Sequence, residues 1–176
     1  ERLMNYAAIE WLPPELDLNG ITATQIFAKL YSVFQMDIKC GNLFFSGTKV
    51  GYRPGIEPDG MGYESVFWHL IQKKEVSGER VPDYPRAKKL PWFKPTIENY
   101  QDHRVRAWDY QEAQKKKGVR TYIWLDPLDL LIILKRTILQ KSNKEVMNII
   151  TTFHIDKISY REKIRNKWRN RIIEYT

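Results

Sequence analysis

Apolar residues recur every four positions in the first half of the chain, which is the spacing of one face of a helix. Over 21–34 helical spacing links Ile26, Leu30, Val33 and Phe34. Thr22 stands just before them, where its hydroxyl can accept a hydrogen bond from the free amides of a first helical turn. The pattern therefore predicts a helix over 21–34 with Thr22 as its N-cap.

A second helix is predicted over 63–74. Its apolar face would consist of Val66, Phe67, Leu70 and Ile71. His69 and Lys73 lie four residues apart, so a helix would place them on a common face. This face is the first candidate for chemistry, because the chain has only 3 histidines.

The segments around this helix carry other signals. The stretch NLFFSGTKVGY over 42–52 predicts two short strands joined at a Ser-Gly turn. Gly and Pro are dense over 53–62 and recur over 76–85, so both segments are predicted to be loops. Residues 86–100 again have a helical pattern, with prolines near a first turn. The residues expected to pack inward there are Trp92, Ile97 and Tyr100.

In the second half the period falls to two, which is typical of strands. Over 119–126 one side of the predicted strand carries Arg120, Tyr122 and Trp124, and the other side carries Thr121, Ile123 and Leu125. Residues 130–137 and 146–155 predict two further strands. Because the links between these segments are short, the three strands should form an antiparallel meander.

The last segment, 159–175, is a predicted basic helix whose apolar residues Ile164, Trp168 and Ile172 are four apart and would dock it on the sheet. The expected fold is therefore α+β: N-terminal helices packed on an antiparallel sheet of about four strands, closed by a basic C-terminal helix. We expect residues 1–40 to be an N-terminal helical appendage and residues 41–176 to form the main domain.

Composition adds a strong positive charge to this picture. Hydrophobic residues make up 43% of the 176 residues, enough for a packed core, and Lys plus Arg exceed Asp plus Glu to give a net charge of +8. Such a surplus attracts phosphates and other polyanions. A soluble basic protein with no such partner has the same composition, so charge alone does not separate the two.

Several classes of site and location are disfavoured. The single Cys40 excludes an internal disulfide and is typical of a reducing compartment, so we expect the cytoplasm. No apolar run approaches about 18 residues, so no membrane span is expected. The histidines are scattered and no glycine-rich nucleotide loop occurs, so we expect neither a metal nor a cofactor. His103, in a polar segment read as a linker, is assigned no role.

The order of the motifs resembles a known group of nucleases. A helix with FWHL, then ERVPDYPRAKKLPW, VRTYIWLDPLDLLIILKR and IITTFHID, followed by a basic tail, is similar to the phage-encoded families of the BECR group. That group joins barnase, EndoU, colicin-type tRNases and RelE-like toxins. The resemblance covers residues 44–170.

This resemblance implies a metal-independent ribonuclease with its site on the open face of a four-stranded sheet. By this resemblance, His69 corresponds to the family's helix histidine. Arg120 corresponds to the family's basic residue at the start of a strand, here the predicted strand over 119–126. The hydroxyl of the last strand would be Thr151 or Thr152; strand parity lets only one of them face the site, and the resemblance does not choose between them.

The residues themselves fit this chemistry. RNA carries its own nucleophile, the 2′-hydroxyl, so cleavage needs a base, an acid and positive charge near the phosphate. The unperturbed pKa of histidine, about 6.5, suits the base. Lys73 would lower the pKa of His69 by like-charge repulsion. The alternative is that His69 is a half-buried helix residue making one backbone bond.

The other candidates have equally plain alternatives. Arg120 could grip the scissile phosphate or lie solvated at a strand end. Tyr122 or Trp124 could stack a base or lie buried beneath a helix. His154 could be a second acid or base, or only cap the end of its strand. The predicted RNA contacts are Lys73, Arg80, Arg86, Tyr122, Lys135, His154, Arg161 and Arg165.

The favoured function is thus a metal-independent endoribonuclease that leaves a 2′,3′-cyclic phosphate. The resemblance adds that it would be a toxin-type or phage-defence enzyme cutting tRNA or another RNA, with an immunity protein or antitoxin as its partner. Two alternatives stay open: a non-catalytic nucleic-acid-binding module that uses the same basic residues, and an interaction protein that docks a partner through its N-terminal segment.

Overall fold

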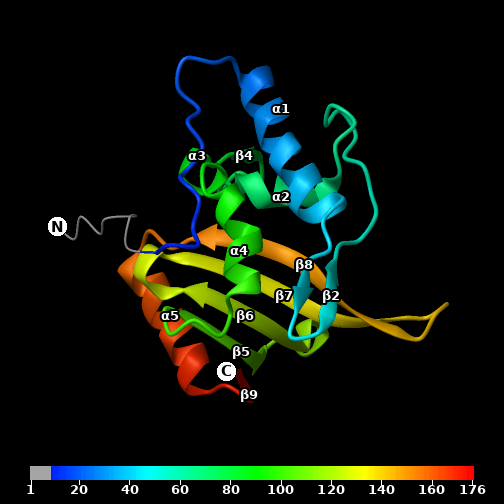
Figure 1. The fold of residues 1–176 in the computed structure, drawn as a ribbon, viewed down its shortest axis with the longest axis vertical. Helices are drawn as coiled ribbons and strands as arrows, with labels where there is room; N and C mark the ends of the chain where they lie inside the picture. Colours follow the sequence, from blue (N-terminus) through cyan, green and yellow to red (C-terminus); the bar gives the residue numbers. More distant parts are fainter. Residues whose placement is uncertain (1–8) are drawn as a thin grey trace.

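The computed structural model describes residues 9–176, which form an α+β fold around a large curled sheet (Figure 1). The sheet has 7 strands in the order β1-β2-β8-β7-β6-β5-β9. The strands are β1 Phe44–Phe45, β2 Thr48–Gly51, β5 Val105–Gln111, β6 Val119–Leu125, β7 Leu130–Leu139, β8 Lys144–His154 and β9 Ile173–Tyr175. The helices are α1 Ala23–Phe34, α2 Ser65–Ile71, α3 Tyr84–Ala87, α4 Phe93–Glu98 and α5 Ile158–Arg169.

The sheet is mixed and larger than the four-stranded antiparallel sheet expected from the sequence. Strands β5 to β8 are consecutive and antiparallel, but β9 adds to the outer edge of β5 and β2 pairs in parallel with β8. The strand β5 was not predicted, because its polar residues Arg106, Asp109 and Gln111 make the segment as hydrophilic as a linker. It missed β9 because that strand is only 3 residues long and its pairing with β5 is a long-range contact.

The predicted N-terminal helix is confirmed as α1. The backbone amide of Thr22 donates to Gln25 Oε1 at 2.8 Å, and the amide of Gln25 donates to Thr22 Oγ1 at 3.3 Å. This reciprocal pair is a capping box, which satisfies two amides that the first turn would leave free. A five-residue π-helical turn, Gln35–Lys39, continues the helix.

The second helix is shorter than predicted. α2 ends at Ile71, and the next residues extend into β3, Gln72–Lys74, which pairs with β4, Arg80–Pro82. Lys73 therefore lies on a strand and not one helical turn beyond His69. The predicted loop over 76–85 is correspondingly a hairpin turn followed by β4.

The two faces of the sheet carry separate cores. On one face Ile123, Leu125 and Ile132 pack with α1, α2 and α4 in the main core. On the other face Trp108, Tyr122, Trp124, Leu131 and Ile133 form a second cluster with Ile164 of α5, against which Trp168 packs. The predicted alternation along β6 is confirmed. α5 stops at Arg169, so Ile172, predicted to dock the helix, lies beyond it and is 56% exposed.

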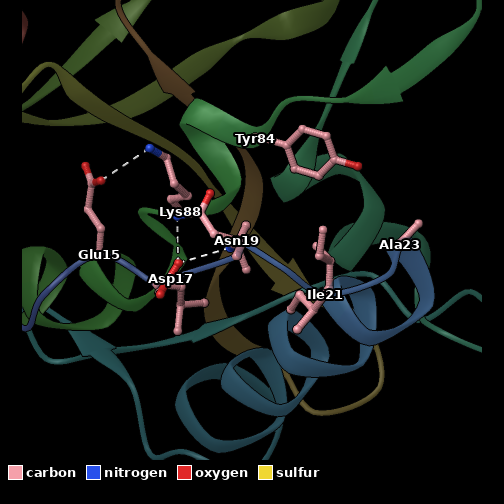
Figure 2. Close-up of a pocket in the computed structure, with 10 residues that line it drawn as sticks. Glu15, Asp17, Asn19, Ile21, Ala23, Tyr84 and Lys88 are labelled. Carbon is pink, nitrogen blue, oxygen red and sulfur yellow. Dashed lines mark hydrogen bonds and ion pairs between the residues drawn. The ribbon is translucent and has the colours of Figure 1, made fainter.

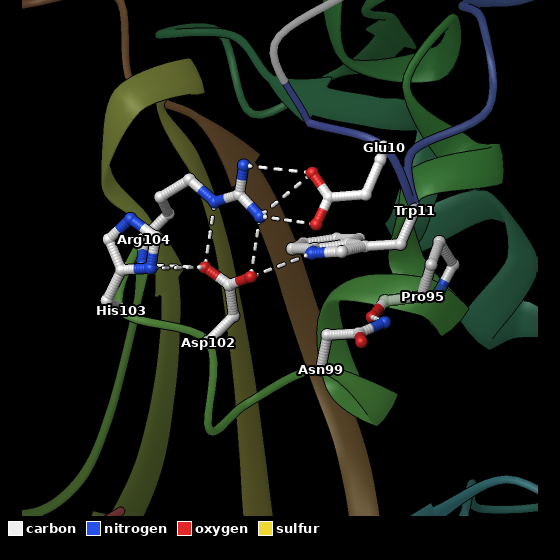
Figure 3. Close-up of polar contacts among 7 residues, drawn as sticks. All are labelled: Glu10, Trp11, Pro95, Asn99, Asp102, His103 and Arg104. Atoms are coloured by element: carbon white, nitrogen blue, oxygen red, sulfur yellow. Dashed lines mark hydrogen bonds and ion pairs between the residues drawn. The ribbon is translucent and has the colours of Figure 1, made fainter.

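The segment before α1 is tied into the same body. Trp11 Nε1 donates to Asp102 Oδ2 at 2.9 Å, and Arg104 bridges Asp102 and Glu10 (Figure 3). The Arg104 guanidinium holds the pKa of the Asp102 carboxyl well below its usual range. The main core includes Ile9, Ile26, Leu30, Phe34 and Ile38. Residues 9–40 thus share one core with the rest of the chain, and the packing contains no break at residue 40.

Candidate functional site

A row of polar side chains crosses the sheet on the face that carries α5. Tyr110 of β5 pairs with Arg120 of β6, and Lys135 of β7 pairs with Asn148 of β8, which also pairs with Gly51 of β2. Thr121 pairs with Leu134, so the antiparallel register places Arg120 beside Lys135. Residues paired across neighbouring strands point to the same face. The register therefore gathers Arg120, Lys135 and Asn148 from three strands.

A β-bulge borders this row. Leu134 pairs with Ile149 and Ile133 pairs with Thr151, so Ile150 of β8 has no partner on β7. A bulge bends its strand and re-aims the side chains that follow, and bulges are common beside active sites. β2 ends at Gly51, and α2 packs against β8 in this region. A residue of α2 can therefore reach the α5 face around the edge of the sheet.

His69 is that residue. A hollow of about 340 Å³ is lined by His69 of α2 together with Arg120, Lys135 and Asn148 of the row, and by Arg53 of the loop that follows β2. We call it the Arg120 hollow. The structure thus brings together the histidine and the arginine that the sequence singled out, although they are 51 residues apart in the chain.

A second hollow adjoins the first at His69. It measures about 490 Å³, and we call it the Arg80 hollow. Its polar lining consists of His69, Gln72, Lys73, Lys74, Arg80, Arg86 and Thr151. His69 and Ile150 line both hollows, so the two form one continuous surface, which we call the basic groove.

The groove is strongly positive. No Asp or Glu of residues 9–176 lines either hollow. Among residues 9–176, no carboxylate forms an ion pair with Arg53, Arg80, Arg120 or Lys135. The Nε atom of Arg120 is buried and has no hydrogen-bond partner in the described part of the chain. Unpaired cations with buried donors leave the groove able to bind an anion.

His69 is half-buried in this groove. Its burial and the nearby charge of Arg80 lower its pKa below the usual value, while Glu57 opposes the shift. The expected cause, Lys73, is wrong: the Lys73 ammonium pairs with Glu75 at 3.3 Å. His69 is consequently neutral near pH 7 and can accept a proton.

The structure separates the two threonines. Thr151 faces the same side as Ile133 and lines the Arg80 hollow. Thr152 points into the main core, where it is buried and its Oγ1 donates to the carbonyl oxygen of Leu131 at 3.0 Å. The expected role of Thr152 in the site is therefore corrected, and Thr151 is the threonine that can touch a ligand.

The expected role of Tyr122 in base stacking is also corrected. Tyr122 is buried beneath α5, where its hydroxyl bonds to Glu112 and accepts from Lys167 Nζ at 2.6 Å. Burial and the neighbouring Glu112 carboxylate raise the pKa of the Tyr122 hydroxyl. Trp124 is equally buried, as the alternative interpretation expected. Neither ring is accessible to a base.

His154 lies away from the groove. It pairs with Leu130 and faces the main core side of the sheet, where Lys89 Nζ is 2.7 Å from its Nδ1. It lines neither hollow of the groove. A second acid or base beside His69 is therefore not supplied by His154.

Two of the predicted phosphate contacts on the C-terminal helix are engaged elsewhere. Arg161 pairs with Asp126 and Asp129, and Arg165 pairs with Glu162 at 2.6 Å. Neither lines the groove. The positive stripe of α5 is thus largely neutralised by carboxylates that are distant in sequence or one turn away.

Arg86 is a structural residue at the floor of the Arg80 hollow. It is buried, its guanidinium donates to the carbonyl oxygens of His69 and Gln72, and it pairs with Asp83 at 3.3 Å. These carbonyls lie at the C-terminal end of α2, where helix carbonyls lack partners. Arg86 therefore holds α2 and, with it, His69 in place.

A third hollow, of about 650 Å³, lies between α1, α3 and the segment before α1 (Figure 2). Its charged lining is Glu15, Asp17 and Lys88, and Lys88 pairs with Glu15 at 3.6 Å. The two carboxylates in its lining make this hollow unsuited to a polyanion.

Sequence reasoning missed Arg53 and Asn148. Arg53 stands in a segment read as a loop, and an exposed arginine in a loop carries no signal of its own. Asn148 interrupts the otherwise apolar run VMNII, and a polar residue on the buried part of a strand is a signal that could have been used.

Within residues 9–176 no helix is long and apolar enough to cross a membrane, and no group of three His, Cys, Asp or Glu side chains is close enough to hold a metal ion. Comparison of the chain with protein-family models, with curated proteins and with solved structures gave no match.

Proposed function

We propose that this protein is a metal-independent endoribonuclease that binds an RNA strand in the basic groove. The observation that carries the proposal is that His69 and Arg120 line one hollow with two further cations and no carboxylate. This arrangement provides a neutral proton acceptor beside a guanidinium that has no ion pair in the described part of the chain. RNA supplies the remaining reactant, its 2′-hydroxyl.

In the proposed reaction His69 takes the proton of the 2′-hydroxyl as that oxygen bonds to the adjacent phosphorus. The bond from phosphorus to the 5′-oxygen breaks, and the leaving oxygen takes a proton from water or from the protonated His69. The products are a 2′,3′-cyclic phosphate and a 5′-hydroxyl. Arg120 can place two N–H groups against the phosphate oxygens, where negative charge grows in the transition state.

The four consecutive antiparallel strands β5 to β8, with helices before them, support membership of the BECR group as part of this proposal. The extra strands at both edges and the cover of α5 over Trp108 and Trp124 depart from that group's simpler sheet. The groove accordingly lies beside α5, at the bulged edge, and not across an open face.

The proposed substrate is cellular RNA, tRNA among the candidates, and the proposed setting is cytoplasmic toxin or phage-defence activity. A toxic ribonuclease must be inhibited in the cell that makes it, so the proposed protein partner is an immunity protein or antitoxin. The groove would favour an acidic inhibitor because opposite charges across an interface steer association.

A second candidate function is binding without cleavage. It is favoured by one observation: among the described residues that line the groove, His69 is the sole histidine and Asp and Glu do not occur. Metal-independent ribonucleases commonly need both a base and an acid. If water cannot protonate the leaving oxygen fast enough, the same groove would hold RNA intact.

Incubation of the protein with labelled RNA in EDTA separates the two candidates. We expect cleavage, cyclic-phosphate ends, and a loss of at least about 100-fold in rate for His69→Ala. The matched control is His103→Ala, because the His103 side chain is 86% exposed and lies outside the groove. Tight binding with no cutting by the wild-type protein would replace the enzyme proposal with the binding one.

A further inference from the structure

Asn148 is a largely buried polar residue whose side-chain amide is hydrogen-bonded by no residue that the structure describes. It is 8% exposed and lies in the sheet between Lys135 of β7 and Gly51 of β2. An asparagine amide offers two donor hydrogens and an acceptor oxygen. Among residues 9–176, none of the side-chain hydrogen bonds involves the Asn148 amide. The Asn148 amide is not among the fully buried side-chain atoms, so it opens onto the hollow, where a ligand can hydrogen-bond it.

The surroundings of Asn148 supply donors. Arg53, Arg120 and Lys135 line the same hollow, and all three can only donate. The Oδ1 atom of Asn148 therefore gives this strongly cationic hollow an acceptor beside a donor. Gly51 lies beside this amide: a Cβ built at that position would be 3.0 Å from Val146 Cγ1 and 4.0 Å from Asn148 Oδ1.

This division of groups matches the two parts of a nucleotide. The three cations suit the phosphate, whereas the amide oxygen would repel a phosphate and attract an N–H group. A hollow of about 340 Å³ falls within the size of pockets that hold small ligands, about 300–1,000 Å³. A base carries N–H groups beside ring acceptors, and the paired donor and acceptor of asparagine fit the N6 and N7 atoms of adenine.

We propose that Asn148 is the specificity-determining residue of the groove and that it hydrogen-bonds the edge of an adenine base held in the Arg120 hollow. This inference rests on the proposed binding of RNA in the groove. It does not depend on cleavage, because the same contact would serve a protein that only binds.

The test uses four heptanucleotides of DNA-type sugar, each with one kind of base, because they lack the 2′-hydroxyl and cannot be cut by the proposed reaction. Affinity is measured by fluorescence anisotropy at fixed salt for the wild-type protein, Asn148→Ala and Asn42→Ala. Asn42 is exposed and lies outside the groove, so it is the matched control. Thermal unfolding establishes that each variant is folded.

We expect the wild-type protein to bind the adenine oligonucleotide most tightly, and Asn148→Ala to weaken that affinity about tenfold. The other three oligonucleotides should change less than about twofold, and Asn42→Ala should change none of them. An equal loss for all four bases would mean that the amide contacts the sugar or phosphate, and it would overturn the proposal. An unchanged adenine preference in Asn148→Ala would also overturn it.

A second variant, Asn148→Asp, keeps the shape of the side chain and removes its donor. The carboxylate would lie beside Lys135, with Arg120 one strand further along the same row, so the fold should tolerate it. Because a carboxylate accepts from cytosine N4, the preference should shift from adenine toward cytosine. A wild-type protein that never cuts RNA but shows these base preferences would remove the enzyme proposal and keep the role of Asn148. A wild-type protein that cuts RNA but shows no adenine preference would keep the enzyme proposal and overturn the role of Asn148.

Discussion

Lys89 Nζ lies 2.7 Å from His154 Nδ1, and the two side chains meet in the half-buried space beneath the end of β8. An ammonium group can only donate, so Nδ1 must accept and His154 must be neutral, with its proton on Nε2. Burial, and after it the charge of Lys89, lower the pKa of His154, while Asp129, Asp156 and Asp83 oppose the shift. The pair therefore links the stability of the fold to pH.

The first prediction concerns this link. The folded protein resists protonating His154, whereas the unfolded chain protonates it below about pH 6.5, so stability is full above that pH and falls as the pH drops toward the lower folded pKa. Because His154 is partly solvated, the loss should not exceed about 1 kcal/mol. Urea unfolding at pH 8 and pH 5.5 measures it. His154→Gln should reduce the difference, with the contribution of His69 remaining, and exposed His103→Gln should leave it unchanged.

The second prediction concerns the pKa of His69. Its value, measured by NMR titration, should be below about 6.5, and Arg80→Ala should raise it because a nearby positive charge is removed. Lys73→Ala is the control, since that ammonium already pairs with Glu75. If the protein cleaves RNA, the acid limb of its pH–rate profile should move to higher pH in Arg80→Ala alone. An equal shift in both variants would contradict this assignment.

The third prediction tests the guanidinium of the Arg120 hollow. Arg120→Ala should lower the turnover of RNA by at least about 100-fold, because it removes donors aimed at developing charge. Arg120→Lys should recover only part of the rate, since a single ammonium cannot make the paired contact of the arginine fork. Single-turnover rates measure the effect. The melting temperature should be almost unchanged, because no described residue hydrogen-bonds the Arg120 side chain.

The fourth prediction concerns salt. Each cation that contacts a phosphate of a single strand contributes about −0.7 to the slope of log affinity against log salt. Arg80→Ala and Lys135→Ala should therefore each flatten the slope by about that amount. Arg165→Ala should not, because Arg165 lies outside the groove and pairs with Glu162. If only Arg165→Ala flattened the slope of log affinity against log salt, RNA would bind on α5 and not in the basic groove.

The fifth prediction separates Arg86 from the other cations of the groove. Arg86→Met should destabilise the protein by about 3 kcal/mol, because it leaves Asp83 and the last carbonyls of α2 without a buried partner. Arg80→Met, at an exposed position with no ion pair among residues 9–176, should change stability by less than about 0.5 kcal/mol. Denaturant unfolding of both variants measures the difference.

The elements with a strong repeat were the ones that could be predicted. The helix over 21–34 and the strand β6 follow from the spacing of their apolar residues, whereas β7 and β8 were predicted from apolar segments separated by short polar links. β5 and β9 could not be found in this way. Their strand state depends on partners far away in the chain, and their polar residues hide the local pattern.

Local periodicity and the chemistry of single residues were enough to predict the α+β class and the shared face of Arg120, Tyr122 and Trp124. Together with the family resemblance they also selected His69 and Arg120 as candidates. Which of these side chains meet depends on the tertiary structure. The register of β6, β7 and β8 and the bulge at Ile150 bring Arg120, His69 and Asn148 to one hollow, while α5 buries Tyr122 and Trp124. Strand register and helix docking depend on packing between residues far apart in the chain, so they cannot be predicted from the spacing of neighbouring residues.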